Sequence, residues 1–235
     1  MITKKVYILS GAGLSAESGV RTFRDTNGLW EEYKVEDVCS VAGYERNPQL
    51  VLDFYDARRA DIKDKKPNYA HEGIAKLKQR YPDNIEVLTQ NVDDLLERAG
   101  CQDVVHLHGT LTDLRCEDCG QVFAIGYDSQ TGSVCPRCKS DRIRHNVVMF
   151  GEPAPEYVHL HKLYNEADMV VVIGTSGYVI DTAYIAQLVP YSILNNLDSD
   201  ENIDKYFSKV YIKKATEAID DIVKDVEEFL GLKKS

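Results

Sequence analysis

Two pairs of closely spaced cysteines constrain this chain more than any other feature. Cys116 and Cys119 form one C-x-x-C pair, and Cys135 and Cys138 form a second pair after fifteen intervening residues. This spacing is typical of structural zinc sites, in which four thiolates surround Zn²⁺ tetrahedrally and leave no position open for catalysis. We therefore expect a zinc-binding module at residues 113–145, with one structural Zn²⁺ per chain.

The apolar runs of the sequence are short. The first, Val6 to Leu9, is too short for a signal peptide, and the longest other run, Met169 to Ile173, has the length of a strand and not of a membrane span. We therefore expect a soluble, cytoplasmic protein without a membrane partner. In that reducing compartment a metal site is a better interpretation of the cysteine pairs than disulfides.

The charge balance argues against nucleic acid as a partner. The formal net charge is −10, and a protein that binds nucleic acid needs at least a local basic patch. One basic cluster lies beside the cysteines, and we interpret it as a solvated face: Arg137, Lys139, Arg142 and Arg144. Of the two remaining cysteines, Cys39 and Cys101, we expect only ordinary packing in the protein interior.

The rest of the chain alternates between short apolar strands and helices. Strands are predicted at residues 5–9, 85–88, 104–107, 146–150, 169–173, 191–194 and 210–212. The longer helices are predicted at residues 45–65, 71–81, 159–166, 181–188 and 215–230, with a shorter helix ending near residue 99. This alternation predicts an α/β fold, with a parallel sheet covered by helices on both faces. A ligand is then expected at the carboxyl edge of the sheet.

A loop of small residues follows the first predicted strand. Gly11, Gly13 and Ala16 fit the loose form of the dinucleotide fingerprint, in which small residues let backbone amides approach a pyrophosphate. Glycines also serve ordinary tight turns, and no acidic residue follows on a second strand at the expected distance. Taken alone, the loop sequence is equally consistent with a dinucleotide-binding site and with an ordinary tight turn.

Two further polar motifs follow predicted strands. Thr89-Gln90-Asn91-Val92-Asp93 places amides and a carboxylate at the same edge of the sheet as the glycine loop, and His106-Leu107-His108 follows the next strand. The period of two in an extended chain puts both histidines on one face. A histidine beside a nucleotide pocket can act as a general base, because its pKa lies near the working pH. For either histidine alone, a structural role is the simpler interpretation.

Together and in this order, the motifs resemble those of the sirtuins, a family of NAD-dependent protein lysine deacylases. The resemblance covers nearly the whole chain and rests on Gly11–Gly19, Phe23-Arg24, Thr89–Asp93, His108-Gly109, the cysteine pairs, Phe150–Glu152 and Gly174–Ser176. It implies a Rossmann-like NAD-binding domain made of residues 1–30, 73–112 and 146–235. A small domain would combine a helical module at 31–72 with the zinc ribbon at 113–145.

The resemblance also implies roles for individual residues. His108 would be the general base toward a ribose hydroxyl, assisted by Asn91 and Asp93. NAD⁺ would be held by Gly11, Ala12, Gly13, Ser15, Ala16, Glu17, Thr22, Phe23, Arg24, Trp30, Gln90, Asn91, Asp93, His108, Gly174, Thr175, Ser176, Asn196, Leu197, Asp198 and Ala215. The backbone of an acyl-lysine substrate would pair as an added strand with Val148, Met149, Phe150, Gly151 and Glu152. The products would be free lysine, nicotinamide and O-acyl-ADP-ribose, and the enzyme is expected to be a monomer.

A finer resemblance concerns the acyl group. Tyr55 and Arg58 stand at i and i+3 of a predicted helix and are therefore neighbours on one helical face. Sirtuins of the desuccinylase and demalonylase type carry such a pair, in which the guanidinium can bind a distal carboxylate bidentately. Arg59 is expected to point elsewhere. His145-Asn146 and Met149 depart from the commoner sirtuin pattern, which has Pro-His and a tryptophan there.

Two other functions remain open. A mono-ADP-ribosyltransferase would use the same NAD⁺ with a different acceptor, but the intact His108 and the Tyr55/Arg58 pair favour deacylation. A zinc-ribbon module that binds nucleic acid and only senses NAD⁺ is a third possibility. The acidic charge and the lack of interleaved aromatic and basic residues count against it.

Overall fold

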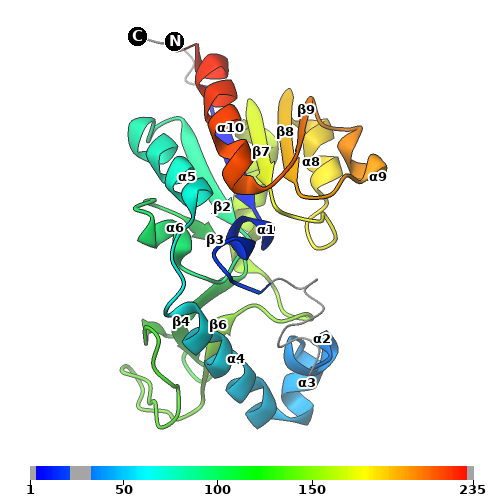
Figure 1. The fold of residues 1–235 in the computed structure, drawn as a ribbon. Helices are drawn as coiled ribbons and strands as arrows, with labels where there is room; N and C mark the ends of the chain where they lie inside the picture. Colours follow the sequence, from blue (N-terminus) through cyan, green and yellow to red (C-terminus); the bar gives the residue numbers. More distant parts are fainter. Residues whose placement is uncertain (1–3, 22–32, 232–235) are drawn as a thin grey trace.

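The computed structural model describes residues 4–21 and 33–231. Its larger part is a six-stranded sheet in which all neighbouring strands are parallel (Figure 1). The strands, in their spatial order, are β3 (Val105–His106), β2 (Ile85–Thr89), β1 (Val6–Ser10), β7 (Met169–Ile173), β8 (Tyr191–Asn196) and β9 (Lys209–Ile212). The chain order reverses between β1 and β7, and such a reversal opens the crevice where doubly wound sheets bind their ligands.

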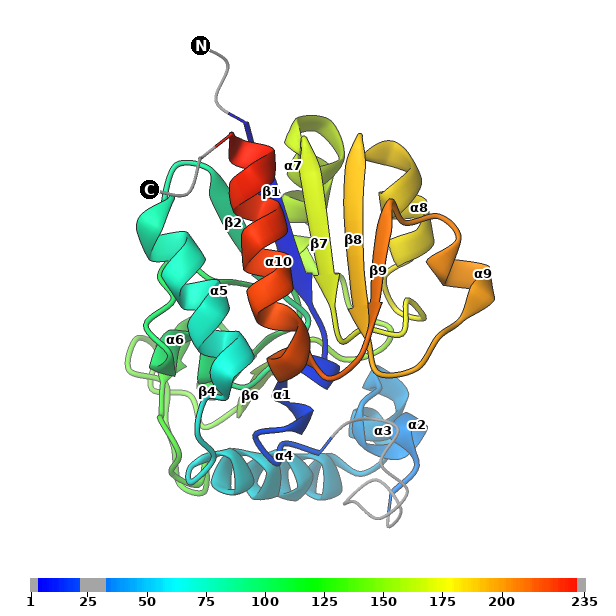
Figure 2. The ribbon, with the colours of Figure 1, turned by 45° about the horizontal axis from the view of Figure 1, so that its top comes forward.

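Helices cover both faces of this sheet. Figure 2 shows α5 (Tyr69–Arg80) and α10 (Ala215–Leu230) side by side on one face, with α7 (Val158–Glu166) and α8 (Thr182–Leu188) on the other. Every residue of β1 and β7 is buried, because alternate side chains enter two separate cores. This burial on both faces is the reason that the two strands appear as continuous apolar runs in the sequence.

The smaller part combines a second sheet with three helices. The sheet is antiparallel and consists of β5 (Val122–Ala124), β4 (Gly109–Cys116) and β6 (Ile143–Val147), in that order. The helices are α2 (Val35–Val38), α3 (Val41–Arg46) and α4 (Pro48–Ile62). Phe54 and Tyr55 of α4 share one core with Leu111 of β4 and with Met149, so the helices and the ribbon strands pack as a unit. The remaining short helices are α1 (Gly13–Ala16), α6 (Leu95–Arg98), α9 (Glu201–Asp204) and the 3₁₀ turn η1 (Pro155–Tyr157).

The predicted α/β fold is confirmed, but the helix predicted at 45–65 is wrong as a single element. It divides into α3 and α4, because the Asn47 side chain accepts a hydrogen bond from the Leu50 amide and Pro48 opens the new helix. The expected domain boundary at 72/73 falls within α5, and the one at 112/113 falls within β4. The division into domains stays a prediction.

The solvated face expected beside the cysteines is wrong for Arg144. Its side chain is only 2% exposed and forms ion pairs with Glu117 and Glu152. The other three residues of the basic cluster are exposed, as predicted. Cys101 is buried in the core beneath α5 and α10, which confirms its packing role. No helix among the described residues is long and apolar enough to cross a membrane.

Candidate active site and zinc centre

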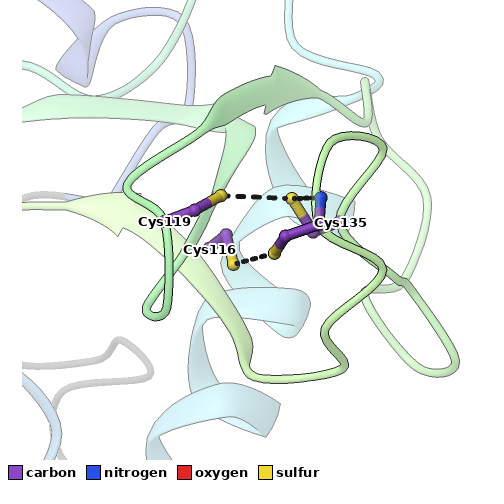
Figure 3. A group of neighbouring side chains, drawn as sticks. Cys116, Cys119 and Cys135 are labelled. Atoms are coloured by element: carbon purple, nitrogen blue, oxygen red, sulfur yellow. Dashed lines mark hydrogen bonds between the residues drawn. The ribbon is translucent and has the colours of Figure 1, made fainter.

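The four paired cysteines converge on one point of the ribbon. Cys116 ends β4, Cys119 follows in the turn, and Cys135 and Cys138 lie in the loop before β6 (Figure 3). All four sulfur atoms lie within 4.8 Å of one another, and the Cys116–Cys138 and Cys119–Cys135 sulfur pairs are each 3.6 Å apart. A tetrahedral zinc site with Zn–S bonds of about 2.3 Å requires sulfur atoms about 3.8 Å apart. The tetrad therefore fits a structural Zn²⁺ site with four thiolate ligands.

The glycine loop after β1 packs directly on the loop after β7. The Gly11 amide donates to the Ile173 carbonyl at 2.9 Å, and the Gly13 amide donates to the Gly174 carbonyl at 2.8 Å. A Cβ atom on Gly13 would lie 2.7 Å from the Gly174 Cα, and Gly174 itself has a φ of +65°. The glycines are therefore required for two backbones to touch at the switch point, a role that the fingerprint alone did not predict.

A cavity of about 1310 Å³ opens at this edge of the sheet. It is lined by most of the predicted site residues: Gly11, Ala12, Gly13, Ala16, Glu17, Tyr55, Gln90, Asn91, His108, Val148, Met149, Phe150, Gly151, Glu152, Gly174, Thr175, Ser176, Asn196, Leu197, Asp198 and Ala215. Ser15, Arg58 and Asp93 instead line a smaller cavity of about 50 Å³. The predicted residues Thr22, Phe23, Arg24 and Trp30 lie outside the described residues.

The two cavities are adjacent, because Ala12, Gln90 and Asn91 line both. Glu17 lies at the rim of the larger cavity, where its carboxylate accepts hydrogen bonds from the amide and hydroxyl of Thr216 in the first turn of α10. The helix N-terminus favours this negative charge. Glu17 therefore joins the glycine loop to α10.

His108 has the geometry of a neutral base. Its Nδ1 lies 3.1 Å from the Gln90 carbonyl, and its Nε2 lies 2.9 Å from the Tyr157 hydroxyl. A carbonyl only accepts, so Nδ1 carries the proton and Nε2 holds the lone pair. Burial lowers the pKa of His108, and the hydrogen bond to Gln90 only partly offsets this effect. The imidazole is therefore neutral near pH 7, with its basic nitrogen in the cavity.

His106 is different, although it lies only two residues away. Its Nδ1 hydrogen-bonds to the Asn91 carbonyl, and its Nε2 lies 2.7 Å from the Glu97 carboxylate. Burial alone would lower the pKa of His106, but the hydrogen bond and charge of Glu97 outweigh it, and the pKa is raised. His106 is a structural ion-pair residue, and His108 is the only one of the two that lines the cavity.

Asn91 is held by a buried hydrogen-bonded network that sequence reasoning missed. Its Nδ2 donates to the Ser15 hydroxyl at 3.1 Å, and the same hydroxyl lies 3.2 Å from His71 Nε2. The Asn68 amide donates to His71 Nδ1, which leaves Nε2 as the protonated nitrogen. Burial lowers the pKa of His71 to about 4. The Asn-x-x-His spacing at the start of α5 is a capping box, and it was the available sequence signal.

Asp93, in the loop between β2 and α6, and Arg58 of α4 both line the smaller cavity. Asp93 is 6% exposed, and its carboxylate accepts a hydrogen bond from the Leu95 amide. Burial raises the pKa of Asp93 and lowers the pKa of the Arg58 guanidinium. Each charged form is therefore costly in its own surroundings and gains from an opposite charge nearby.

Tyr55 lines the larger cavity and not the smaller one that Asp93 lines. Its hydroxyl is 3.5 Å from the Cys39 sulfur, and its ring stacks on His145 with centroids 3.7 Å apart. The predicted acyl-binding pair therefore lies on two adjacent cavities. Arg59 is fully buried, donates to the Leu111 carbonyl and lines neither cavity, which agrees with the prediction that it points elsewhere.

The segment predicted to bind the substrate backbone is itself partly paired. The Phe150 amide donates to the Cys39 carbonyl, and the Phe150 carbonyl accepts from the Val41 amide. The Glu152 carboxylate accepts from the Met149 amide and pairs with Arg144. The segment thus joins the ribbon to the helical module along one edge. That it binds a peptide stays a prediction.

A parallel sheet with a switch-point cavity, joined to a four-cysteine ribbon, defines an α/β nucleotide-binding protein with a structural metal centre. Residues 11–181 match the model of the Sir2 family, and the chain belongs to that family. It is 54% identical over 227 residues to an NAD-dependent protein deacylase of Campylobacter jejuni, with 97% of each chain covered.

Two solved structures of Sir2 proteins share the fold. A Sir2 homologue in complex with NAD is 34% identical and superimposes with a TM-score of 0.83, covering 97% of this chain and 91% of that chain. A Sir2 variant with a deacetylated peptide and 3'-O-acetyl ADP ribose is 25% identical, with a TM-score of 0.77 over 99% of this chain and 96% of that chain.

Proposed function

We propose that this protein is an NAD-dependent protein lysine deacylase that removes succinyl and malonyl groups, and also acetyl groups, from lysine. The observation that carries this proposal is the neutral His108, whose Nε2 faces a cavity bounded by the glycine loop in a chain of the Sir2 family. The C. jejuni relative is named an NAD-dependent protein deacylase, and the two solved structures contain NAD or 3'-O-acetyl ADP ribose.

Each residue of the site would have a role that follows from its position. NAD⁺ would supply the ribose carbon that receives the acyl oxygen, with nicotinamide as the leaving group. His108 would remove a proton from a ribose hydroxyl at Nε2, while the Gln90 carbonyl holds the ring in the required tautomer. Asn91 is fixed by Ser15, which positions its amide at the boundary between the two cavities. The four cysteines of the ribbon would hold Zn²⁺ in a closed structural site, which would take no part in the reaction.

The acidic acyl preference is supported by the state of Arg58. Burial opposes the charge of its guanidinium, and Tyr55, Cys39, Asp61 and Asp93 favour that charge. A carboxylate at the end of an acyl chain would compensate this charge with two hydrogen bonds. Tyr55, one helical turn earlier, contributes a phenol in the wall of the neighbouring cavity.

A panel of acyl-lysine peptides tests this proposal. We expect kcat/KM with NAD⁺ to be higher for succinyl- and malonyl-lysine than for acetyl-lysine. The variant Arg58→Met should lower kcat/KM for succinyl-lysine by about 10- to 100-fold, the size of a lost charge-assisted hydrogen bond, and change the acetyl value by less than about threefold.

The variant Lys63→Met is the matched control, because Lys63 is an exposed cation at the end of the same helix. It should leave both substrates unaffected. If Arg58→Met lowered kcat/KM equally for succinyl- and acetyl-lysine, Arg58 would support the fold and would not bind the acyl carboxylate.

A further inference from the structure

The basic nitrogen of His108 already has a hydrogen-bond donor within the protein. The Tyr157 hydroxyl lies 2.9 Å from Nε2. Because Nδ1 donates to the Gln90 carbonyl, Nε2 can only accept, and the phenol must donate. The single lone pair of Nε2 is therefore occupied, and a ribose hydroxyl cannot donate to it while Tyr157 remains in place.

Tyr157 comes from an element separate from the one that carries His108. It ends the 3₁₀ turn η1, just before α7, and it lines the same cavity as His108. Its ring lies 5.8 Å from the imidazole, centroid to centroid, and is tilted by 45°. Burial raises the pKa of Tyr157, so the phenol keeps its proton and remains a donor at neutral pH. On its other side the ring packs against the core beneath α7 and α8.

We propose that Tyr157 is a positioning residue that caps Nε2 of His108 in the cofactor-free protein and yields it to a ribose hydroxyl when the cofactor binds. The cap holds the imidazole in the tautomer and orientation that the base requires. It also makes the phenol and the ribose competitors for one lone pair. This inference rests on the proposed function, because it takes the competing hydroxyl to be that of NAD⁺.

The competition predicts the effect of removing the phenol oxygen. The variant Tyr157→Phe keeps the ring and its packing but no longer competes for Nε2. NAD⁺ should then bind about two- to tenfold more tightly, the equivalent of one net hydrogen bond. The KM for NAD⁺ should fall by more than kcat changes.

A double-mutant cycle separates this effect from a general change in the cavity. NAD⁺ binding is measured by calorimetry for the wild type, Tyr157→Phe, His108→Ala and the double variant. The gain in NAD⁺ affinity from Tyr157→Phe should disappear when His108 is alanine, because the lone pair for which the phenol and the ribose compete is then absent. An equal gain in both backgrounds, or unchanged or weaker binding in Tyr157→Phe, would overturn the proposal. Tyr164→Phe is the control, since this half-buried tyrosine of α7 packs in the same core without contacting His108.

A second readout needs no cofactor and so does not depend on the proposed function. Diethyl pyrocarbonate reacts with the unprotonated nitrogen of histidine, and its attachment to His108 can be followed by peptide mass spectrometry. Without NAD⁺, His108 should react faster in Tyr157→Phe than in the wild type, while His106 should not change. Equal rates at His108 would contradict the cap. If the wild type failed to bind NAD⁺ but His108 still reacted faster in Tyr157→Phe than in the wild type, the proposed function would be refuted and the cap would remain supported.

Discussion

One buried and two half-buried histidines show how much the surroundings of one residue type decide its role. Burial lowers the pKa of His71 to about 4 and also lowers that of His108, whereas Glu97 raises that of His106. His71 anchors the network that holds Asn91, His106 forms an ion pair, and His108 keeps a lone pair directed into the cavity. The spacing of residues 106–108 did not distinguish the last two, because the partner Glu97 lies in another element, and only the resemblance to the sirtuins favoured His108 as the base.

The pKa of His71 predicts a loss of stability in mild acid. An unfolded histidine has a pKa of about 6.5, and the folded value is about 4, so the unfolded chain binds more protons between these two values. The stabilisation is present above pH 6.5 and is lost as the pH falls toward 4, by up to about 3 kcal/mol in the free energy of unfolding. Urea titrations at several pH values measure it.

The variant His71→Gln should flatten this pH dependence, and His161→Gln is its control because His161 is exposed on α7. If the slope of unfolding free energy against pH were the same in His71→Gln and the wild type, the burial of His71 would not be the cause.

At the level of elements, the packing of α5 on α10 depends on one small residue. Gly73 of α5 faces Ile219 of α10, and a Cβ atom on Gly73 would overlap the Ile219 side chain. Figure 2 shows the two helices side by side over the sheet. Glycine is otherwise unfavourable inside a helix, so its presence here reflects the close approach.

Gly73→Ala should therefore destabilise the protein by about 1–3 kcal/mol, although alanine is the better helix former. Chemical denaturation measures this change, and Glu72→Ala, at an exposed position of the same helix, should change stability by less than about 0.5 kcal/mol. In an Ile219→Ala background the cost of Gly73→Ala should largely disappear. A stabilised Gly73→Ala protein would contradict the packing argument.

Strands and long helices were predictable from periodicity, whereas contacts between distant segments were not. The strand predicted at residues 169–173 and the helix predicted at 215–230 coincide with β7 and α10, because each is fixed by its own apolar pattern. The shorter helix predicted to end near residue 99 is confirmed as α6, a single turn that ends at Arg98. The stacking of His145 on Tyr55 joins residues ninety positions apart, and no local pattern indicates it.

In the molecule as a whole, the zinc ribbon supports two walls of the cavity. β4 begins directly after His108, and β6 leads into Val148–Glu152. β4 ends at Cys116 of the tetrad, and Cys116 pairs with Ile143 at the start of β6. A Zn²⁺ ion bound to the tetrad would therefore affect the site through the positions of these two strands.

Loss of the metal should consequently reduce activity although zinc takes no part in the reaction. We expect one Zn²⁺ per chain by elemental analysis, and we expect Cys119→Ser to lose zinc, to melt at a lower temperature and to lose at least about tenfold in kcat/KM. Cys101→Ala is the control, because Cys101 lies in the core of the large sheet and should retain zinc. A zinc-free protein with unchanged melting temperature and activity would refute a structural role for the tetrad.

The fate of the acyl group distinguishes deacylation from the other possible reactions, and product analysis follows it. The protein is incubated with NAD⁺ and a succinyl-lysine peptide, and all products are identified by mass spectrometry. We expect free-lysine peptide, nicotinamide and O-succinyl-ADP-ribose in equal amounts. A peptide that gains ADP-ribose, or deacylation without consumption of NAD⁺, would contradict it.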